Sequence, residues 1–360
     1  MALFDLTPKA TARALYGRDS ELQTLARLVE HGRWAAVLGP RMVGKTSLAK
    51  AAASQSRRSV IYVNLWGAKG TSGLLNALLH GINASKPLLQ RLQGAFRRVE
   101  GVTVAGAGIS LTPRPRPLRT VSDLVSVIGE EAGHSVVILD EVQELAAVSG
   151  ALTKMLANVF NTHPEVVFLF TGSHFGLLRT LLEPPTDSPL FGRSPARIQL
   201  EPFDRDTSIG FLEHGFKEYH LQPNRESIGA VVDRSLDGIP GWLTLYGSNV
   251  AVQGMTPEEA ERASVREGKR VARSELIHFL ESRDVSMFWP ALRRLTSTTT
   301  WTELRSVLSA QRGSPVNDHS VGSILRALRD ANLIVESNHQ YLIRDPMVRA
   351  FVRDSRTAPS

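Results

Sequence analysis

The stretch GPRMVGKT, residues 39–46, carries two glycines, a lysine and a threonine in the spacing G-x-x-x-x-G-K-[ST]. Glycines at these positions let backbone N–H groups curve around phosphate oxygens, and a following helix adds its positive dipole end. Lys45 would neutralise the β and γ phosphates, and the Thr46 hydroxyl would ligate magnesium. The pattern predicts a nucleoside triphosphate site; a glycine turn with an incidental lysine is the alternative. The predicted nucleotide-binding residues of this loop are Gly39, Pro40, Arg41, Met42, Val43, Gly44, Lys45, Thr46 and Ser47.

A second polar cluster ends the apolar run VVILDE, residues 136–141. Open α/β sheets bind ligands beyond the carboxyl ends of their strands, where Asp140 and Glu141 would lie. Asp140 would hold magnesium, directly or through water, and Glu141 would polarise the attacking water. A strand that merely ends in solvated acids is the alternative. Together with the phosphate loop, the pair predicts an ATPase that uses ATP and Mg²⁺.

Four apolar segments separated by helical stretches would position these residues. Continuous apolar runs of this length indicate parallel strands covered by helices on both faces. Together with the phosphate loop, these runs predict an α/β fold of the P-loop NTPase kind, with a parallel sheet. The segments are WAAVLG (34–39), SVIYVNLWG (59–67), HSVVILDEVQEL (134–145) and PEVVFLFTGSH (164–174).

Two further patterns follow the predicted sheet. Helices alone are expected beyond about residue 203, with a capping box at Thr256 opening a long one. Beyond about residue 284, a capping box at Thr300, a second helix at 318–331 and a hairpin around Asn338 predict a winged helix-turn-helix. We expect three domains, which are a P-loop ATPase domain (1–202), a helical lid (203–283) and a winged-helix domain (284–360).

Composition narrows the function further. The absence of cysteine excludes disulfides, thiolate metal sites and cysteine nucleophiles. No leader or membrane-length apolar run is evident, so we expect a soluble, cytoplasmic protein without a membrane partner. Residues 86–120 carry seven basic side chains against one acid, out of a net charge of +7. This basic insertion, with a hairpin and a Pro-Arg string, could bind a phosphate backbone or be a solvated surface feature.

The predicted helix 318–331 has one apolar stripe and one polar face. Its polar face could enter the major groove of duplex DNA. Winged helices also contact proteins or fold back on a nucleotide domain, so DNA and a protein partner both stay open. The residues of the polar face are Ser320, Ser323, Arg326 and Arg329.

From about Leu15 to Val352 the sequence resembles the archaeal-type ATPase family of AAA+/STAND P-loop proteins. The phosphate loop and the Asp-Glu pair are shared by many ATPases, whereas the Gly-Ser, Gly-Arg and Asp-Pro-x-x-Arg strings are more particular. The segments that carry the resemblance are LYGRDSEL (15–22), GPRMVGKTSL (39–48), VVILDEVQEL (136–145), FTGSHFGLL (170–178), LFGRSPARIQLEPF (190–203) and RDPMVRAFV (344–352).

The resemblance implies further nucleotide contacts. Tyr16, Gly17 and Arg18 match the stretch that packs near the adenine. Gly238-Ile239-Pro240 looks like the G-x-P of the helical lid, so Pro240 would lie near the nucleotide. The sequence shows no evident arginine beside this G-x-P to serve as a second sensor.

The resemblance also implies two catalytic positions. Ser173 occupies the polar sensor position that reads the γ phosphate, with Thr171 as the alternative. Arg193 matches a proposed arginine finger, which would act in cis or on a neighbouring subunit. An action in trans would require a homo-oligomer.

Three functional classes remain at this stage. The first is a DNA-associated ATPase whose hydrolysis changes the angle between its nucleotide domain and its winged helix. The second is a nucleotide-gated switch that times contact with a protein partner. The third is a binding module with negligible turnover, which the presence of both acids makes less favoured.

Overall fold

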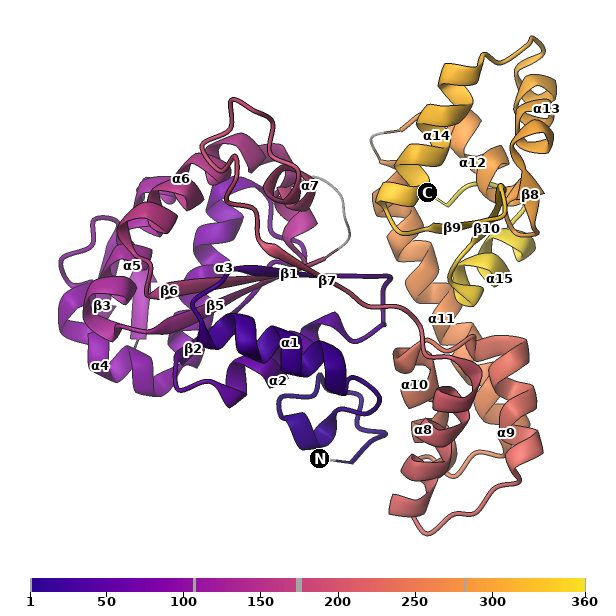
Figure 1. The fold of residues 1–360 in the computed structure, drawn as a ribbon, viewed down its shortest axis with the longest axis horizontal. Coiled ribbons are helices and arrows are strands. Elements are labelled where there is room, and N and C mark those ends of the chain that lie inside the picture. Colours follow the sequence, from indigo (N-terminus) through magenta and orange to yellow (C-terminus); the bar gives the residue numbers. More distant parts are fainter. Residues whose placement is uncertain (1, 106–107, 173–176, 282, 360) are drawn as a thin grey trace. The chain divides into compact units, whose positions relative to one another are not determined.

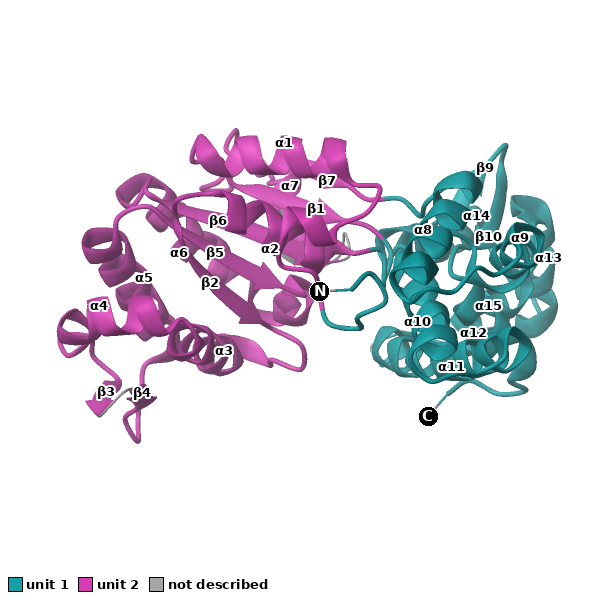
Figure 2. Cartoon of the chain, turned by 90° about the horizontal axis from the view of Figure 1, so that it is seen from below, with its two compact units in different colours: residues 1–7, 40–43, 201–360 teal, residues 8–39, 44–200 magenta. Residues whose placement is uncertain are grey.

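The computed structural model describes residues 2–105, 108–172, 177–281 and 283–359. The chain divides into two compact units, drawn in different colours in Figure 2. The sheet unit comprises residues 8–39 and 44–200, and the helical unit comprises residues 1–7, 40–43 and 201–360. The regions predicted as lid and winged helix lie in the same unit.

The sheet unit is built on five parallel strands in the order β2-β5-β6-β1-β7. Four of them coincide with the four predicted apolar segments. The fifth was not predicted, because it is short, lies at the sheet edge and buries only Ile198. The strands are β1 (Ala35–Leu38), β2 (Ser59–Asn64), β5 (Ser135–Asp140), β6 (Val166–Gly172) and β7 (Ala196–Gln199).

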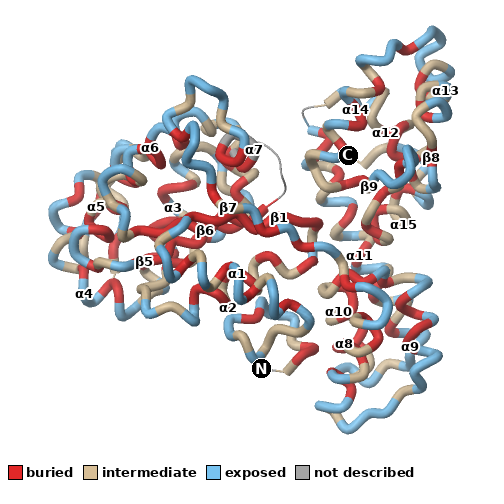
Figure 3. The backbone as a smooth tube through the Cα atoms, in the orientation of Figure 1, coloured by how far each residue is buried: buried red, intermediate tan, exposed pale blue. Residues whose placement is uncertain are grey.

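Helices cover both faces of this sheet, with α1 and α2 on one side and α5 and α6 on the other (Figure 1). Every residue of β1, β5 and β6 is buried, as Figure 3 shows in red, which explains why their sequences are continuous apolar runs. The helices are α1 (Asp19–Glu30), α2 (Lys45–Gln55), α3 (Gly70–Ala84), α4 (Lys86–Phe96), α5 (Pro117–Ala132), α6 (Ser149–Thr162) and α7 (Leu177–Leu182).

The basic insertion contains α4 and an antiparallel hairpin, which occupies the first part of the stretch 102–120 predicted as a hairpin with a Pro-Arg string; from Pro117 that stretch is helical. Its strands are β3 (Val102–Ala105) and β4 (Gly108–Leu111). Three of its arginines form ion pairs with nearby acids, so less positive charge is available to a partner than the sequence count indicates. The pairs are Arg98 with Glu131, Arg116 with Glu100, and Arg119 with Glu100 and Asp123.

Three of the four α-helices that follow the sheet in the chain start at a side-chain cap. The side chains of Asp204, Asn224 and Thr256 each accept a backbone N–H of the first turn, and Thr256 forms the predicted capping box with Glu259. Gly238, at φ 71°, leaves no room for a side chain, because a Cβ there would lie 2.0 Å from the carbonyl oxygen of Phe203. The helices are α8 (Arg205–Glu218), α9 (Arg225–Val231), α10 (Pro240–Ala251) and α11 (Pro257–Leu280).

The last part of the chain is a winged helix, as predicted. Its three-stranded sheet has the order β8-β10-β9, and the turn at Asn338 and His339 has positive φ at both residues, which suits a tight hairpin. Its core is a continuous cluster of buried apolar side chains that includes Leu304, Leu325 and Val348. The elements are α12 (Val285–Arg294), β8 (Thr299–Thr300), α13 (Trp301–Arg312), α14 (Asp318–Asp330), β9 (Ile334–Ser337), β10 (Gln340–Ile343) and α15 (Pro346–Asp354).

No helix in the described ranges combines the length and the apolar character needed to cross a membrane.

A buried carboxylate joins the winged helix to α10. Asp345 caps α15 through the backbone N–H of Met347 and accepts the indole N–H of Trp242, whose nitrogen lies 3.2 Å from Oδ1 and 3.3 Å from Oδ2. Burial raises the pKa of Asp345 to about 6, although these two donors and the charge of Arg349 act in the opposite direction. Arg349 also binds Asp237, just before α10.

This carboxylate predicts a pH-dependent stability. Because its folded pKa is raised, Asp345 binds a proton in the folded chain between about pH 4 and 6, where the unfolded chain has released it. Its contribution to stability is therefore full below the unfolded pKa and is lost as the pH rises through about 6. We expect the stability of the wild type relative to Asp345→Asn to fall by about 2 kcal/mol from pH 4.5 to 7.5, measured by urea unfolding.

The matched control is Asp284→Asn, which changes the exposed N-cap of α12 in the same domain. The difference between wild type and this variant should stay constant over the same pH range. An equal pH trend in both comparisons would contradict the assignment to Asp345.

Candidate active site

The phosphate loop leaves the carboxyl end of β1 and enters α2, as the motif requires. Gly44 has φ 100°, a left-handed conformation that L side chains rarely adopt, so glycine is needed there even though the space around it is open. Lys45 is the first residue of α2 and is 8% exposed. Its ammonium donates to the carbonyl oxygen of Gly39 across the loop, at 3.1 Å. The helix that follows the loop thus starts where the motif predicts it.

The carboxylate of Asp140 lies directly beside the start of α2. Its two oxygens each accept from the hydroxyl of Thr46, at 2.9 Å. Tyr62 donates to Oδ2 at 2.6 Å, and Thr171 donates to Oδ1. Asp140 is 4% exposed, so three hydroxyl donors compensate for the loss of water around its charge.

The aromatic ring of Tyr62 is packed under a cation. The ammonium of Lys50, which lies one turn after Thr46 in α2, is 3.6 Å from the ring centroid. Burial and the negative charge of Asp140 raise the pKa of Tyr62 well above its usual range. Burial lowers the pKa of Lys50, with Asp140 opposing that shift.

Glu141 follows Asp140 in a left-handed backbone conformation, at φ 61° and ψ 47°. For a residue with a side chain this costs about 1–2 kcal/mol, and such outliers often occur at functional sites. The backbone N–H of Glu141 donates to the Thr171 hydroxyl at 3.3 Å, and its Oε2 accepts from the amide of Gln143. These contacts fix the chain where β5 ends, beside the carboxylate that Thr46 contacts.

The oxygen atoms of Thr46 and Asp140 suit a hard cation whose remaining ligands come from a nucleotide and water. Thr46 and Asp140 offer hydroxyl and carboxylate oxygens, which Mg²⁺ prefers. No cluster of three or more His, Asp or Glu side chains with metal-binding geometry occurs among the described residues. A cation held by two protein oxygens, with nucleotide phosphates and water completing its shell, fits this arrangement.

The segment before α1 packs on the first turn of α2. The backbone N–H of Lys9 donates to the Ser47 hydroxyl at 3.0 Å, so this predicted nucleotide ligand already serves a structural contact. Arg18 is buried and pairs with Glu21 at 3.1 Å, Gly17 has φ 61°, and Tyr16 is half-buried. Their predicted contact with the adenine stays a prediction.

The tip of the phosphate loop, residues 40–43, belongs to the helical unit. The carbonyl oxygen of Met42 accepts the backbone N–H of Gly241, at 2.9 Å. A Cβ on Gly241 would lie 2.7 Å from Met42 Cβ and 3.0 Å from this oxygen, so the approach requires glycine. Pro240, predicted as a lid residue near the nucleotide, is the first residue of α10 and directly precedes this contact. No arginine occurs within α10.

Of the two sensor candidates, Ser173 lies outside the described residues. Thr171, the alternative, ends up behind the Asp140 carboxylate, to which its hydroxyl donates. Its position therefore favours a role in holding the acid over a direct reading of phosphate.

Arg193 is not brought to the phosphate loop of its own chain. It precedes β7, whose first residue Ala196 pairs with Ala35 at the start of β1, so it lies beyond the amino edge of the sheet. There its guanidinium donates to Asn161 and lies 5.6 Å from the ring centroid of Phe160. The phosphate loop leaves β1 at the carboxyl end of the strand, about 13 Å from its amino end. This placement disfavours an action in cis.

The predicted nucleic-acid face of α14 is only partly available. Ser323 and Arg326 are exposed, as predicted. Arg329 is exposed as well, but its guanidinium forms an ion pair with Glu336 of β9. Arg326 is therefore the stronger candidate of the two arginines.

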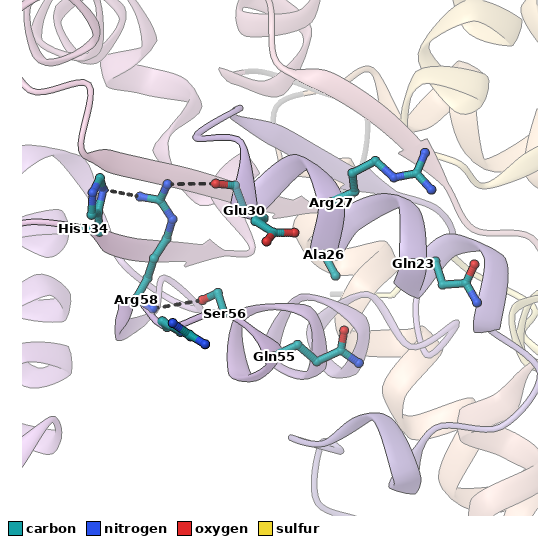
Figure 4. A pocket seen from close by; sticks show the side chains of 9 residues that line it. Gln23, Ala26, Arg27, Glu30, Gln55, Ser56, Arg58 and His134 are labelled. Carbon is teal, nitrogen blue, oxygen red and sulfur yellow. Dashed lines mark hydrogen bonds between the residues drawn. The ribbon is translucent and has the colours of Figure 1, made fainter.

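A pocket of about 810 Å³ lies between α1 and the end of α2, and none of the predicted site residues lines it (Figure 4). Arg58 crosses it, donating to the carbonyl oxygens of Glu30 at 3.3 Å and Glu165 at 3.0 Å and contacting His134. These bonds tie the end of α1 to the amino edge of the sheet, and burial lowers the pKa of Arg58.

Residues 15–245 match the family described as an ATPase domain predominantly from Archaea. The match spans more than half of the chain. The chain belongs to this ATPase family. No curated protein sequence matches it.

Solved structures resemble nearly all of this chain. The Walker-type ATPase PABY2304 of Pyrococcus abyssi is 27% identical over 98% of this chain and 99% of that one, with a TM-score of 0.77. The Aeropyrum pernix ORC2 protein, solved with ADPNP and ADP, is 17% identical over 98% and 96%, with a TM-score of 0.64. The Aeropyrum pernix ORC1 protein, solved in complex with DNA, is 14% identical over 98% and 96%, with a TM-score of 0.50. The two ORC proteins share the fold of this ATPase.

The geometry agrees with the family. In this ATPase the loop that would hold the phosphates, the hydroxyl and carboxylate that would hold a cation, and the candidate base converge at the carboxyl edge of one sheet. Sequence reasoning missed Tyr62 and Lys50. These two residues could be connected with Asp140 only once β2 was known to lie next to β5.

Proposed function

We propose that this ATPase hydrolyses ATP in a Mg²⁺-dependent reaction, and that its nucleotide state controls a winged helix that binds duplex DNA. The observation that carries the first part is the contact between Thr46, at the start of the loop's helix, and the buried carboxylate of Asp140. A bound Mg²⁺ would neutralise charge on the β and γ phosphates.

The residues of the chain divide the remaining tasks. Lys45 and the loop N–H groups bind the phosphates, and Thr46 with Asp140 orient the cation. Glu141 accepts the proton of a water that attacks the γ phosphorus, while the bond from that phosphorus to the ADP oxygen breaks. Arg193 would assist only on the nucleotide of a neighbouring chain.

Contacts within the helical unit support control of the winged helix. The loop tip at Met42 bonds the first turn of α10, and Trp242 in the same turn bonds Asp345 at the start of α15. Arg349 of α15 also binds Asp237, just before α10. A rearrangement of the loop on nucleotide binding would thus act on α10 and, through Trp242, on the winged helix.

Support for duplex DNA as the partner comes from α14, which exposes Ser323 and Arg326 in a winged helix. The ORC1 protein of similar fold was solved with DNA. The test is ATPase activity at several protein concentrations, with and without duplex DNA. Stimulation by DNA supports the proposal, and a specific rate that rises with protein concentration supports a homo-oligomer with Arg193 acting in trans.

A protein partner is the second candidate. The ion pairs of Arg329 with Glu336 and of Arg305 with Asp318 reduce the positive charge around α14, which favours contact with a less anionic surface than DNA. ATP-dependent binding that persists at high salt, with no DNA stimulation, would favour this switch function.

We expect Arg326→Ala to weaken duplex binding by about 1–3 kcal/mol, which is about 5- to 150-fold, without changing ATP affinity. Arg329→Ala should have a smaller effect, because Glu336 already holds that guanidinium. Fluorescence anisotropy of a labelled duplex measures both. The control is Arg353→Ala, an exposed arginine of α15. Equal affinities for the wild type and Arg326→Ala would remove α14 as the DNA-binding face.

A further inference from the structure

We propose that Tyr62 is a positioning residue that fixes the Asp140 carboxylate for the Mg²⁺ of the bound nucleotide. The inference rests on the proposed function, since it assigns Tyr62 a role toward the cation that Thr46 and Asp140 would hold. Tyr62 lies outside the phosphate loop and outside the Asp-Glu pair.

The first step is the arrangement of donors around Asp140. The Thr46 hydroxyl lies 2.9 Å from both oxygens, so it stands symmetrically in front of the carboxylate. The other two hydroxyls divide the oxygens between them, with Thr171 on Oδ1 and Tyr62 on Oδ2. The carboxylate plane is therefore held from two sides by groups that are not expected to touch a nucleotide.

The second step is the proton count. A hydroxyl has one proton, so Thr46 cannot satisfy both oxygens on its own. If Thr46 directs its lone pairs to a cation, Tyr62 and Thr171 still donate one hydrogen bond to each carboxylate oxygen. Each oxygen keeps a second lone pair for the cation or its bound water. Without the Tyr62 hydroxyl, Oδ2 would depend on Thr46 alone and the carboxylate could turn.

The third step is how Tyr62 itself is held. In the β2–β5 ladder Tyr62 pairs with Ile138 and Asn64 pairs with Asp140, so Tyr62 and Asp140 lie on the same face of the sheet two residues apart. Lys50 of α2 places its ammonium over the ring at 3.6 Å. The helix that supplies Lys45 and Thr46 thus also fixes the ring whose hydroxyl reaches Asp140.

A purely structural role is the competing explanation, because a buried tyrosine usually finds some partner for its hydroxyl. The two explanations differ in what removal of the hydroxyl changes. A structural role affects the stability of the fold alone. A positioning role changes the response to Mg²⁺, because groups that orient metal ligands typically alter metal affinity by 10–100-fold.

The test uses the full chain with Tyr62→Phe, which removes only the hydroxyl. Binding of a fluorescent, non-hydrolysable ATP analogue is measured in EDTA and across a Mg²⁺ titration. We expect the Mg²⁺ concentration for half-maximal tightening to rise about tenfold, with affinity in EDTA unchanged. The control is Tyr341→Phe, which also removes a tyrosine hydroxyl bonded to a carboxylate, that of Glu336 in the winged helix, and should behave as wild type.

Two results with the Tyr62→Phe variant would overturn the inference. One is a Mg²⁺ midpoint equal to that of the wild type. The other is an equal loss of affinity with and without Mg²⁺, accompanied by a lower melting temperature of the nucleotide-free variant, which would assign Tyr62 a structural role. A wild type that binds the analogue equally with Mg²⁺ and EDTA would refute the proposed Mg²⁺ dependence itself, and Tyr62 would then have no cation to serve.

Discussion

We expect Glu141→Gln to slow turnover strongly while ATP still binds. The amide keeps the size of the side chain but cannot take a proton from water, and general bases typically contribute 10²–10⁴-fold to rate. We therefore expect phosphate release to fall by about 10²–10⁴-fold. Calorimetric affinity for ATP should stay within a few-fold of the wild type, because Glu141 is not among the groups expected to hold the phosphates.

The control for this prediction is Glu144→Gln, three residues further along in the short helix at Val142–Val148. It makes the same chemical change on a neighbouring acid, so normal turnover is expected. Wild-type turnover by Glu141→Gln would place the base on another residue.

Lys45→Ala is expected to lose nucleotide affinity. The ammonium is almost buried and aligned within the loop by its bond to the Gly39 carbonyl oxygen, so the phosphates would lose a partner that water cannot replace. Removing one member of a buried charge pair typically costs about 2–5 kcal/mol, or about 30-fold to several thousand-fold in affinity. Isothermal titration with ATP and Mg²⁺ measures this loss.

Lys154→Ala, which removes an exposed lysine from α6, is the matched control and should bind ATP normally. Because alanine is a good helix former, the first turn of α2 should persist in Lys45→Ala. Unchanged ATP affinity in Lys45→Ala would refute the phosphate-loop assignment.

Much of this fold follows from short-range sequence signals. The fully buried strands β1, β5 and β6 are continuous apolar runs, and the capping boxes at Thr256 and Thr300 mark helix starts that the structure reproduces. Such features depend on residues three or four apart, so one sequence is enough to find them. The edge strand β7 was missed because a single buried residue, Ile198, gives no readable alternation.

The parts of the site that could not be predicted depend on which elements become neighbours. Tyr62 reaches Asp140 only because β2 lies beside β5, a strand order that local patterns do not encode. From the sequence, Arg193 could act on the nucleotide of its own chain or of a neighbouring chain. The register of β7 with β1 places it at the amino ends of these strands, whereas the phosphate loop follows the carboxyl end of β1. The bond between Met42 and Gly241 joins residues from distant parts of the chain.

The hydrogen bond between Met42 and Gly241 also bears on how the phosphate loop and α10 move. A single carbonyl oxygen of the nucleotide loop is secured by the opening turn of α10, at a point where one added methyl group would collide. Movement of the loop tip and movement of the first turn of α10 would then be coupled through this one hydrogen bond, and the proposed control of the C-terminal domain would depend on it.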